Sequence, residues 1–122
     1  MSYEKIARLV TALSLKTENH ELAWNETEKE GTYETSFPNY SVRISRNEKL
    51  DYNENLMPII LLELTNQNGE IIEQIDDEDL RNLLQDPYPL MKNMYDTARR
   101  QAMGVEDALD AILNIIDPEV PF

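Results

Sequence analysis

The chain has 122 residues, no cysteine, and 24 acidic against 11 basic side chains, which gives a net charge of −13 at pH 7. This composition suits one globular domain and excludes disulfides, thiol catalysis and cysteine-ligated zinc. The negative field disfavours direct binding to nucleic acid or to anionic membranes. Because the apolar runs are far shorter than a signal-peptide core or a membrane span, we expect a cytoplasmic protein that is not bound to a membrane.

An amphipathic helix is predicted over residues 3–17. Tyr3, Ile6 and Val10 recur at helical spacing, and Leu13 continues the same face one turn later. Ser2 stands where a helix N-cap is expected. One face of this helix should therefore pack on the rest of the domain.

After this helix the apolar period changes to two, which predicts strands at about 22–28, 32–37 and 40–46 with tight turns between them. The polar stretch 46–55 is predicted to be a loop. A strand at about 57–66 follows, and it belongs to a segment, Leu56–Leu64, that is apolar on both parities, so both of its faces are expected to be buried. Asn68-Gly69 has the chemistry of a type I′ turn and predicts a return strand at about 70–75.

Helices are predicted at about 78–85, 89–103 and 106–116. The acidic run Asp76–Asp79 suits a helix start, where carboxylates cap free N–H groups. From Met91 to Ile116 the apolar residues follow one 4-3-4-3 rhythm, which indicates a packed helical stripe, but Gly104 interrupts it. Since glycine favours the end of a helix and Glu106-Asp107 suit the start of another, we predict a break there.

Together these elements predict a single α+β domain over residues 1–122. It has an N-terminal helix, a five-stranded antiparallel meander sheet, and two to three C-terminal helices packed on the sheet.

No catalytic, cofactor-binding or metal-binding residues are predicted, so we expect a non-enzymatic protein without a cofactor. The glycines Gly31, Gly69 and Gly104 are isolated and cannot form a phosphate-binding loop. His20 is the sole histidine and stands in a polar connection without an evident orienting partner. The acids at 76–79 are contiguous, whereas a calcium loop needs alternate acids and a glycine.

Candidate interaction residues come from two groups of side chains. Aromatic residues on neighbouring predicted strands could line a groove, although such a set is more often part of a sheet core. Arg99-Arg100 is the one basic doublet and could bind a carboxylate, although Asp96 is spaced for an ion pair within the same helix. The candidate surface comprises Trp24, Tyr33, Phe37, Tyr40, Arg99 and Arg100.

One further observation concerns a set of residues spread along the chain, namely Trp24, 31–33, 40–45, 68–70 and 95–105. In these residues the chain resembles a group of small, standalone, uncharacterised bacterial proteins with a helix, a β-meander and C-terminal helices. The resemblance implies that the whole chain is one bacterial domain, and it implies no active site.

Three functions are open at this point. The first is a protein–protein interaction domain that forms a homodimer, because the apolar strand and stripe need cover on more than one side. The second is an acidic nucleic-acid mimic that inhibits a DNA- or RNA-binding protein, because residues 17–38 and 56–89 concentrate the negative charge. The third is a chaperone or immunity-type protein that binds a basic partner.

Overall fold

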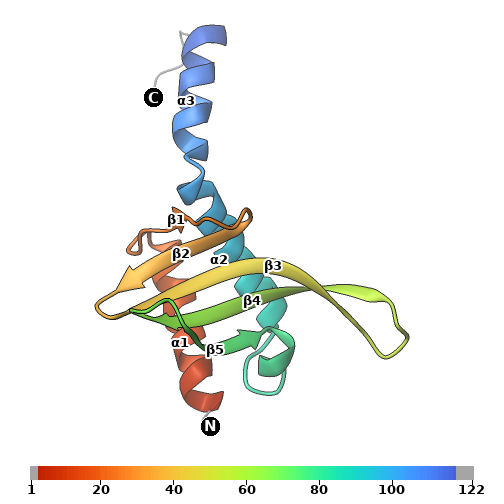
Figure 1. The fold of residues 1–122 in the computed structure, drawn as a ribbon. Helices are drawn as coiled ribbons and strands as arrows, with labels where there is room; N and C mark the ends of the chain where they lie inside the picture. Colours follow the sequence, from red (N-terminus) through yellow and green to blue (C-terminus); the bar gives the residue numbers. More distant parts are fainter. Residues whose placement is uncertain (1–2, 118–122) are drawn as a thin grey trace.

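A computed structural model describes residues 3–117 and shows helices packed against one face of an antiparallel sheet (Figure 1). This order confirms the predicted α+β fold. The elements are α1 (Tyr3–Glu18), β1 (Asn25–Glu26), β2 (Thr32–Phe37), β3 (Tyr40–Leu50), β4 (Leu56–Asn66), β5 (Ile71–Asp76), the 3-10 turn η1 (Glu78–Leu80), α2 (Pro87–Ala102) and α3 (Val105–Ile116).

The five strands lie in sequence order, and each is antiparallel to the next. The tight turns depend on residues that accept positive φ, namely Asn39 (φ 69°) after β2 and Gly69 (φ 80°) after β4. The Asn66 side chain supports the second turn, because its Oδ1 accepts hydrogen bonds from the backbone N–H groups of residues 68 and 70 at 3.0 and 3.1 Å. The meander is therefore formed by local turn chemistry.

The β3–β4 hairpin is longer than predicted. β3 continues to Leu50, which pairs with Leu56, so the first half of the predicted loop 46–55 is strand. Asp51 closes the hairpin, since its Oδ1 accepts hydrogen bonds from the N–H groups of Asn53 and Asn55 at 2.8 and 2.9 Å. The hairpin extends beyond the helices (Figure 1), and the Leu56 side chain is 65% exposed. The expectation of two buried faces is therefore wrong at the start of β4.

Two other predicted elements are shorter in the structure. The strand predicted at 22–28 is only Asn25–Glu26, because Trp24 leaves the ladder to enter the core. The helix predicted at 78–85 is only η1, and the chain then turns through residues 81–86. Asp86 has φ 49°, and it precedes Pro87, whose ring disfavours the right-handed helical conformation in the residue before it. α2 therefore starts as a separate helix with proline in its first turn.

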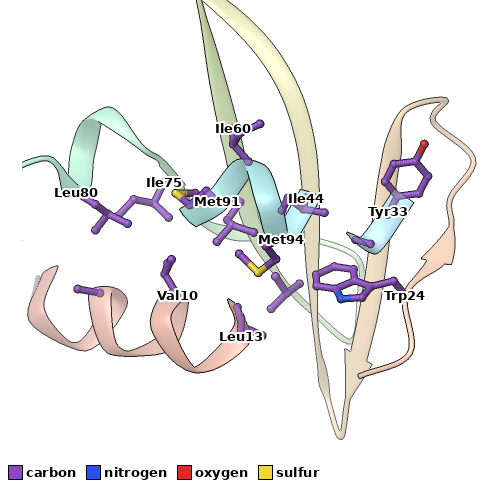
Figure 2. Packing of buried hydrophobic residues seen from close by; sticks show 14 residues of the cluster. Val10, Leu13, Trp24, Tyr33, Ile44, Ile60, Ile75, Leu80, Met91 and Met94 are labelled. Atoms are coloured by element: carbon purple, nitrogen blue, oxygen red, sulfur yellow. The ribbon is translucent and has the colours of Figure 1, made fainter. Parts of the chain in front are cut away.

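The hydrophobic core lies between one face of the sheet and the pair α1 and α2 (Figure 2). Because register pairs Tyr33 with Ile44 and Ile44 with Leu62, these side chains share the helix-facing side. On the other face, Ile59 is buried and Leu61 is half-buried, but within residues 3–117 no helix covers that face. The helical contribution to the core is Ala7, Val10 and Leu13 from α1 and Met91, Met94 and Ala98 from α2.

Trp24 joins three parts of the fold. Its side chain is only 2% exposed and its Nε1 donates a hydrogen bond to Thr17 Oγ1 of α1 at 3.0 Å. Its backbone N–H donates to Gln101 Oε1 of α2 at 3.2 Å rather than to a neighbouring strand. Figure 2 shows the indole in the same cluster as Leu13, Met94 and Tyr33. One residue in a connecting segment therefore links both helices to the sheet.

Replacing Thr17 by valine is expected to lower the free energy of unfolding by about 1–3 kcal/mol, because the buried Trp24 Nε1–H loses its acceptor while the shape of the side chain is kept. Urea denaturation followed by the fluorescence of Trp24, the sole tryptophan, measures this. Thr11→Val on the exposed part of α1 is the control. Equal effects of the two substitutions would contradict the assigned role of Thr17.

Asp77 is a buried carboxylate with a structural task. Its side chain is 3% exposed, and its Oδ1 accepts a hydrogen bond from the Ile60 N–H in β4 at 2.8 Å. Burial raises the pKa of Asp77, although the hydrogen bond from Ile60 opposes this. Beside it, Asp76 and Asp79 each accept a hydrogen bond from the other's backbone N–H at 3.0 Å, the reciprocal pattern of a capping box. The acidic run thus organises the turn into η1, which agrees with its predicted capping role.

Asp77→Leu is expected to lower the free energy of unfolding by about 1–3 kcal/mol, because the Ile60 N–H would lose its acceptor. Asp77→Asn is the matched control, since its amide oxygen can still accept that bond.

The pH dependence of these variants has a definite sign. The pKa of Asp77 is higher in the folded chain than its ordinary value of 3.8, so folding favours the protonated side chain. The resulting contribution to the free energy of unfolding is complete below pH 3.8 and is lost as the pH rises through the pKa of the folded state. The stability of Asp77→Asn relative to the wild type should therefore increase between about pH 4 and about pH 7. Urea denaturation across this range tests it, and a relative stability that falls with pH would show the sign to be wrong.

Candidate interaction surface

The C-terminal helices differ in what they contact. α2 buries Met91, Met94 and Ala98 in the core, so this half of the 4-3-4-3 stripe packs on the domain as predicted. α3 begins where α2 has reached the end of the sheet, and it extends away from the layered body (Figure 1). The second half of the stripe therefore leaves the core, and the expectation that the last helix packs on the sheet is wrong.

The residues of α3 are mostly apolar and none of them is buried. Along its 12 residues every side chain other than those of Glu106, Asp107, Asp110 and Asn114 is apolar. The exposed fractions are 44% for Leu109, 54% for Ile112, 80% for Ile115 and 71% for Ile116. This makes α3 a candidate interaction element, because large exposed apolar surfaces are uncommon on monomeric globular proteins.

The direction of α3 is set by the break at Gly104. α2 ends at Ala102, and Gly104 has φ 66°, the left-handed conformation that glycine adopts without a Cβ penalty. This confirms the predicted break. Arg100 crosses the break to form an ion pair with Glu106 at 2.6 Å, but both side chains are largely exposed, so the pair adds little stability.

Gly104→Ala is expected to disfavour the observed break by about 1–2 kcal/mol, because a Cβ strains the left-handed conformation. An added Cβ meets nothing within 4 Å, so the strain can be relieved by joining α2 and α3 into one helix. Spin labels on cysteines introduced at the exposed positions 93 and 114 should then report a longer distance, toward that of a straight helix with about 1.5 Å rise per residue.

The matched control is Gly69→Ala, because Gly69 also has positive φ with open space around it but lies far from α2 and α3 in the sheet. It should leave the distance between the labels unchanged. An unchanged distance in Gly104→Ala would mean that α2–α3 packing, rather than the glycine, sets the break.

A second exposed apolar surface lies along α1. It is a shallow groove of about 740 Å³, called here the α1 groove, at which Leu9 is 40% and Leu15 is 56% exposed. The basic side chains in its lining are Lys5 and Arg8, with Glu4 beside them. The groove is lined by Glu4, Lys5, Ala7, Arg8, Leu9, Thr11, Ala12, Leu15, Leu83 and Leu84.

The predicted aromatic surface divides between the core and the exterior. Trp24 and Tyr33 are 2% and 5% exposed, because the helix-facing side of the sheet and the two helices enclose them. The Tyr33 ring lies 5.7 Å from that of Tyr95 in α2, which anchors it further. Phe37 and Tyr40, paired at the β2–β3 turn, are 40% and 49% exposed. The four aromatics therefore do not form one groove.

The predicted arginine doublet is also divided. Arg99 is half-buried and Arg100 is exposed in the last turn of α2. Asp96 forms its ion pair with Lys92 at 2.8 Å, and Arg100 forms its own with Glu106, so the expected pairing of Asp96 with the doublet is wrong. Lys92 lies one helical turn before Asp96 and forms the ion pair with it in place of the two arginines.

The surface residues that were not predicted as candidates are the apolar ones of α3 and of the α1 groove. Their signal was present in the sequence, because Leu109, Ile112 and Ile116 belong to the 4-3-4-3 stripe. The same pattern is produced by a helix that faces a core, so periodicity could not show that α3 is exposed.

Polar clusters elsewhere have structural explanations. Arg43 on the outer face of the sheet binds Glu28 at 2.9 Å and Glu34 at 3.4 Å, and the hydrogen bond from Arg43 lowers the pKa of Glu28.

His20 borders a hollow of about 320 Å³ near the α2–α3 break together with Arg100 and Glu106. Within the described residues no group of three or more His, Cys, Asp or Glu side chains is arranged to hold a metal ion.

Comparison of the chain with protein-family models, with curated proteins and with solved structures gives no match. Among residues 3–117, no helix has the length and apolar character needed to span a membrane.

Proposed function

We propose that this chain is a small, acidic, non-enzymatic protein–protein interaction domain that self-associates, with α3 as its binding element. The observation that carries the proposal is the exposure of α3, a helix of 12 mostly apolar residues with none buried. The proposal assigns no catalytic role to any residue.

Helix energetics support a binding role for α3. In water an isolated helix shorter than about 12–15 residues is marginal, and most helical stability in proteins comes from packing of an apolar face. α3 has 12 residues and extends from the body without burying any of them. Moving one large aliphatic side chain from water into an interface contributes about 1.5–3 kcal/mol. Leu109, Ile112, Ile115 and Ile116 can therefore supply the free energy for association when they are covered.

The alternative of a nucleic-acid mimic has weaker support. Such a protein needs unpaired carboxylates spaced along one face. Here Glu28 and Glu34 are paired with Arg43, and Asp76 is paired with Lys49 at 3.1 Å. These carboxylates act within the fold, so the exposed apolar helix is the stronger indication of function.

Ile112→Glu is expected to convert a self-associated wild type to monomer at about 10 μM, raising the dissociation constant at least about tenfold, because a buried charge replaces an apolar contact. Sedimentation velocity measures the state. Asn114→Glu adds the same charge on the polar side of the same helix, so it should not weaken the association.

A wild-type chain that remains monomeric at about 100 μM, well above the micromolar range of specific association, would contradict the self-association that is proposed. Equal weakening by both substitutions would instead indicate an effect of net charge and would remove α3 as the binding element.

A further inference from the structure

We propose that α3 of one copy docks in the α1 groove of a second copy, and that the second copy's α3 docks reciprocally in the groove of the first. This inference rests on the proposed self-association and names the two surfaces that meet. It makes the dimer a mutual exchange of C-terminal helices.

The two surfaces have matching chemistry. α3 presents apolar side chains around most of its circumference, and the α1 groove presents Leu9, Leu15 and Leu83 with exposed fractions of 40%, 56% and 42%. An apolar helix laid in an apolar groove is a common mode of protein recognition. Each surface can therefore cover the other.

Charge favours the groove over a second α3 as the occupant. The charged residues within α3 are Glu106, Asp107 and Asp110, all acidic. Two α3 helices packed together would bring like charges close to one another, which is unfavourable. The α1 groove contains Lys5 and Arg8 against the single acid Glu4, so its lining has a net positive charge. Docking of α3 there brings its acids to opposite charges.

Geometry favours exchange between two copies over docking within one. α3 extends from the end of the body that lies opposite the N-terminus of α1, whereas the α1 groove begins at residue 4 (Figure 1). The helix is therefore directed away from its own groove. In an antiparallel two-fold arrangement, each α3 runs beside the body of the other copy.

Reciprocal docking also closes the assembly. In a two-fold interface each copy contributes both the helix and the groove, so two equivalent contacts form and none is left over for further copies. The two contacts together bury twice the area of one, and stable protein–protein interfaces bury roughly 1,600 Å² in total. A chain of one-way contacts would instead leave one α3 and one groove exposed at its ends.

Complementation between two damaged copies tests the exchange. Leu9→Glu damages the groove and leaves α3 intact, whereas Ile112→Glu damages α3 and leaves the groove intact. Each variant alone should be monomeric, with a dissociation constant raised at least about tenfold. An equimolar mixture should contain more dimer than either variant alone. In the mixed pair, one contact joins the intact α3 of the first variant to the intact groove of the second, whereas the other contact carries both substitutions. Sedimentation velocity of the full-length chains measures all three samples.

The control for the groove is Leu50→Glu on the β3–β4 hairpin, where the leucine is 61% exposed and lies outside the groove. It should dimerise as the wild type does. Because Leu9 and Ile112 are also exposed, far-UV circular dichroism and the urea midpoint of both variants should match those of the wild type, apart from any stability due to association.

The outcomes separate this inference from the function on which it rests. If Leu9→Glu dimerises normally while Ile112→Glu does not, or if the mixture contains no more dimer than each variant alone, docking of α3 in the α1 groove is wrong while self-association through α3 stands. If the wild type itself is monomeric, both proposals fail.

Discussion

The burial of a single face of the sheet is the constraint on which the rest of this structure depends. α1 and α2 together cover that face, and Trp24 fastens both of them to it through its indole, its Nε1–H and its backbone N–H. These two helices occupy the helix-facing side of the sheet. The last helix must then either lie on the polar outer face or leave the body, and Gly104 directs it away.

The outer face of the sheet is poorly suited to receive an apolar helix. Arg43 stands at its centre, bound to Glu28 and Glu34, and Glu63 in β4 accepts a hydrogen bond from Gln74 at 2.8 Å. Covering this row with α3 would remove these charged groups from water at a cost that exceeds their mutual attraction. The apolar side chains of α3 are therefore better covered by apolar surface on another molecule, which is the physical basis of the proposed exchange.

The sequence predicted most of the fold because local chemistry controls most of it. Asn39 and Asn68-Gly69 form tight turns in any context, and the change of apolar period from helical to two separates α1 from the strands. Errors arose where a distant contact overrode the local pattern. Trp24 fits the alternating apolar pattern of a strand, yet its backbone N–H donates a hydrogen bond to the side chain of Gln101, 77 residues away, and not to a neighbouring strand. Residues 46–50 look like a loop, yet pairing with β4 makes them strand.

The sequence by itself determined the order of elements, the break at Gly104 and the apolar character of the last helix. It could not determine what that helix faces, because a 4-3-4-3 rhythm describes only which side chains share one side of a helix. Tertiary structure decided this, since α1 and α2 occupy the sheet and leave Leu109, Ile112, Ile115 and Ile116 in water. It likewise buried Trp24 and Tyr33, which the sequence had grouped with exposed aromatics, because burial depends on which elements meet in three dimensions.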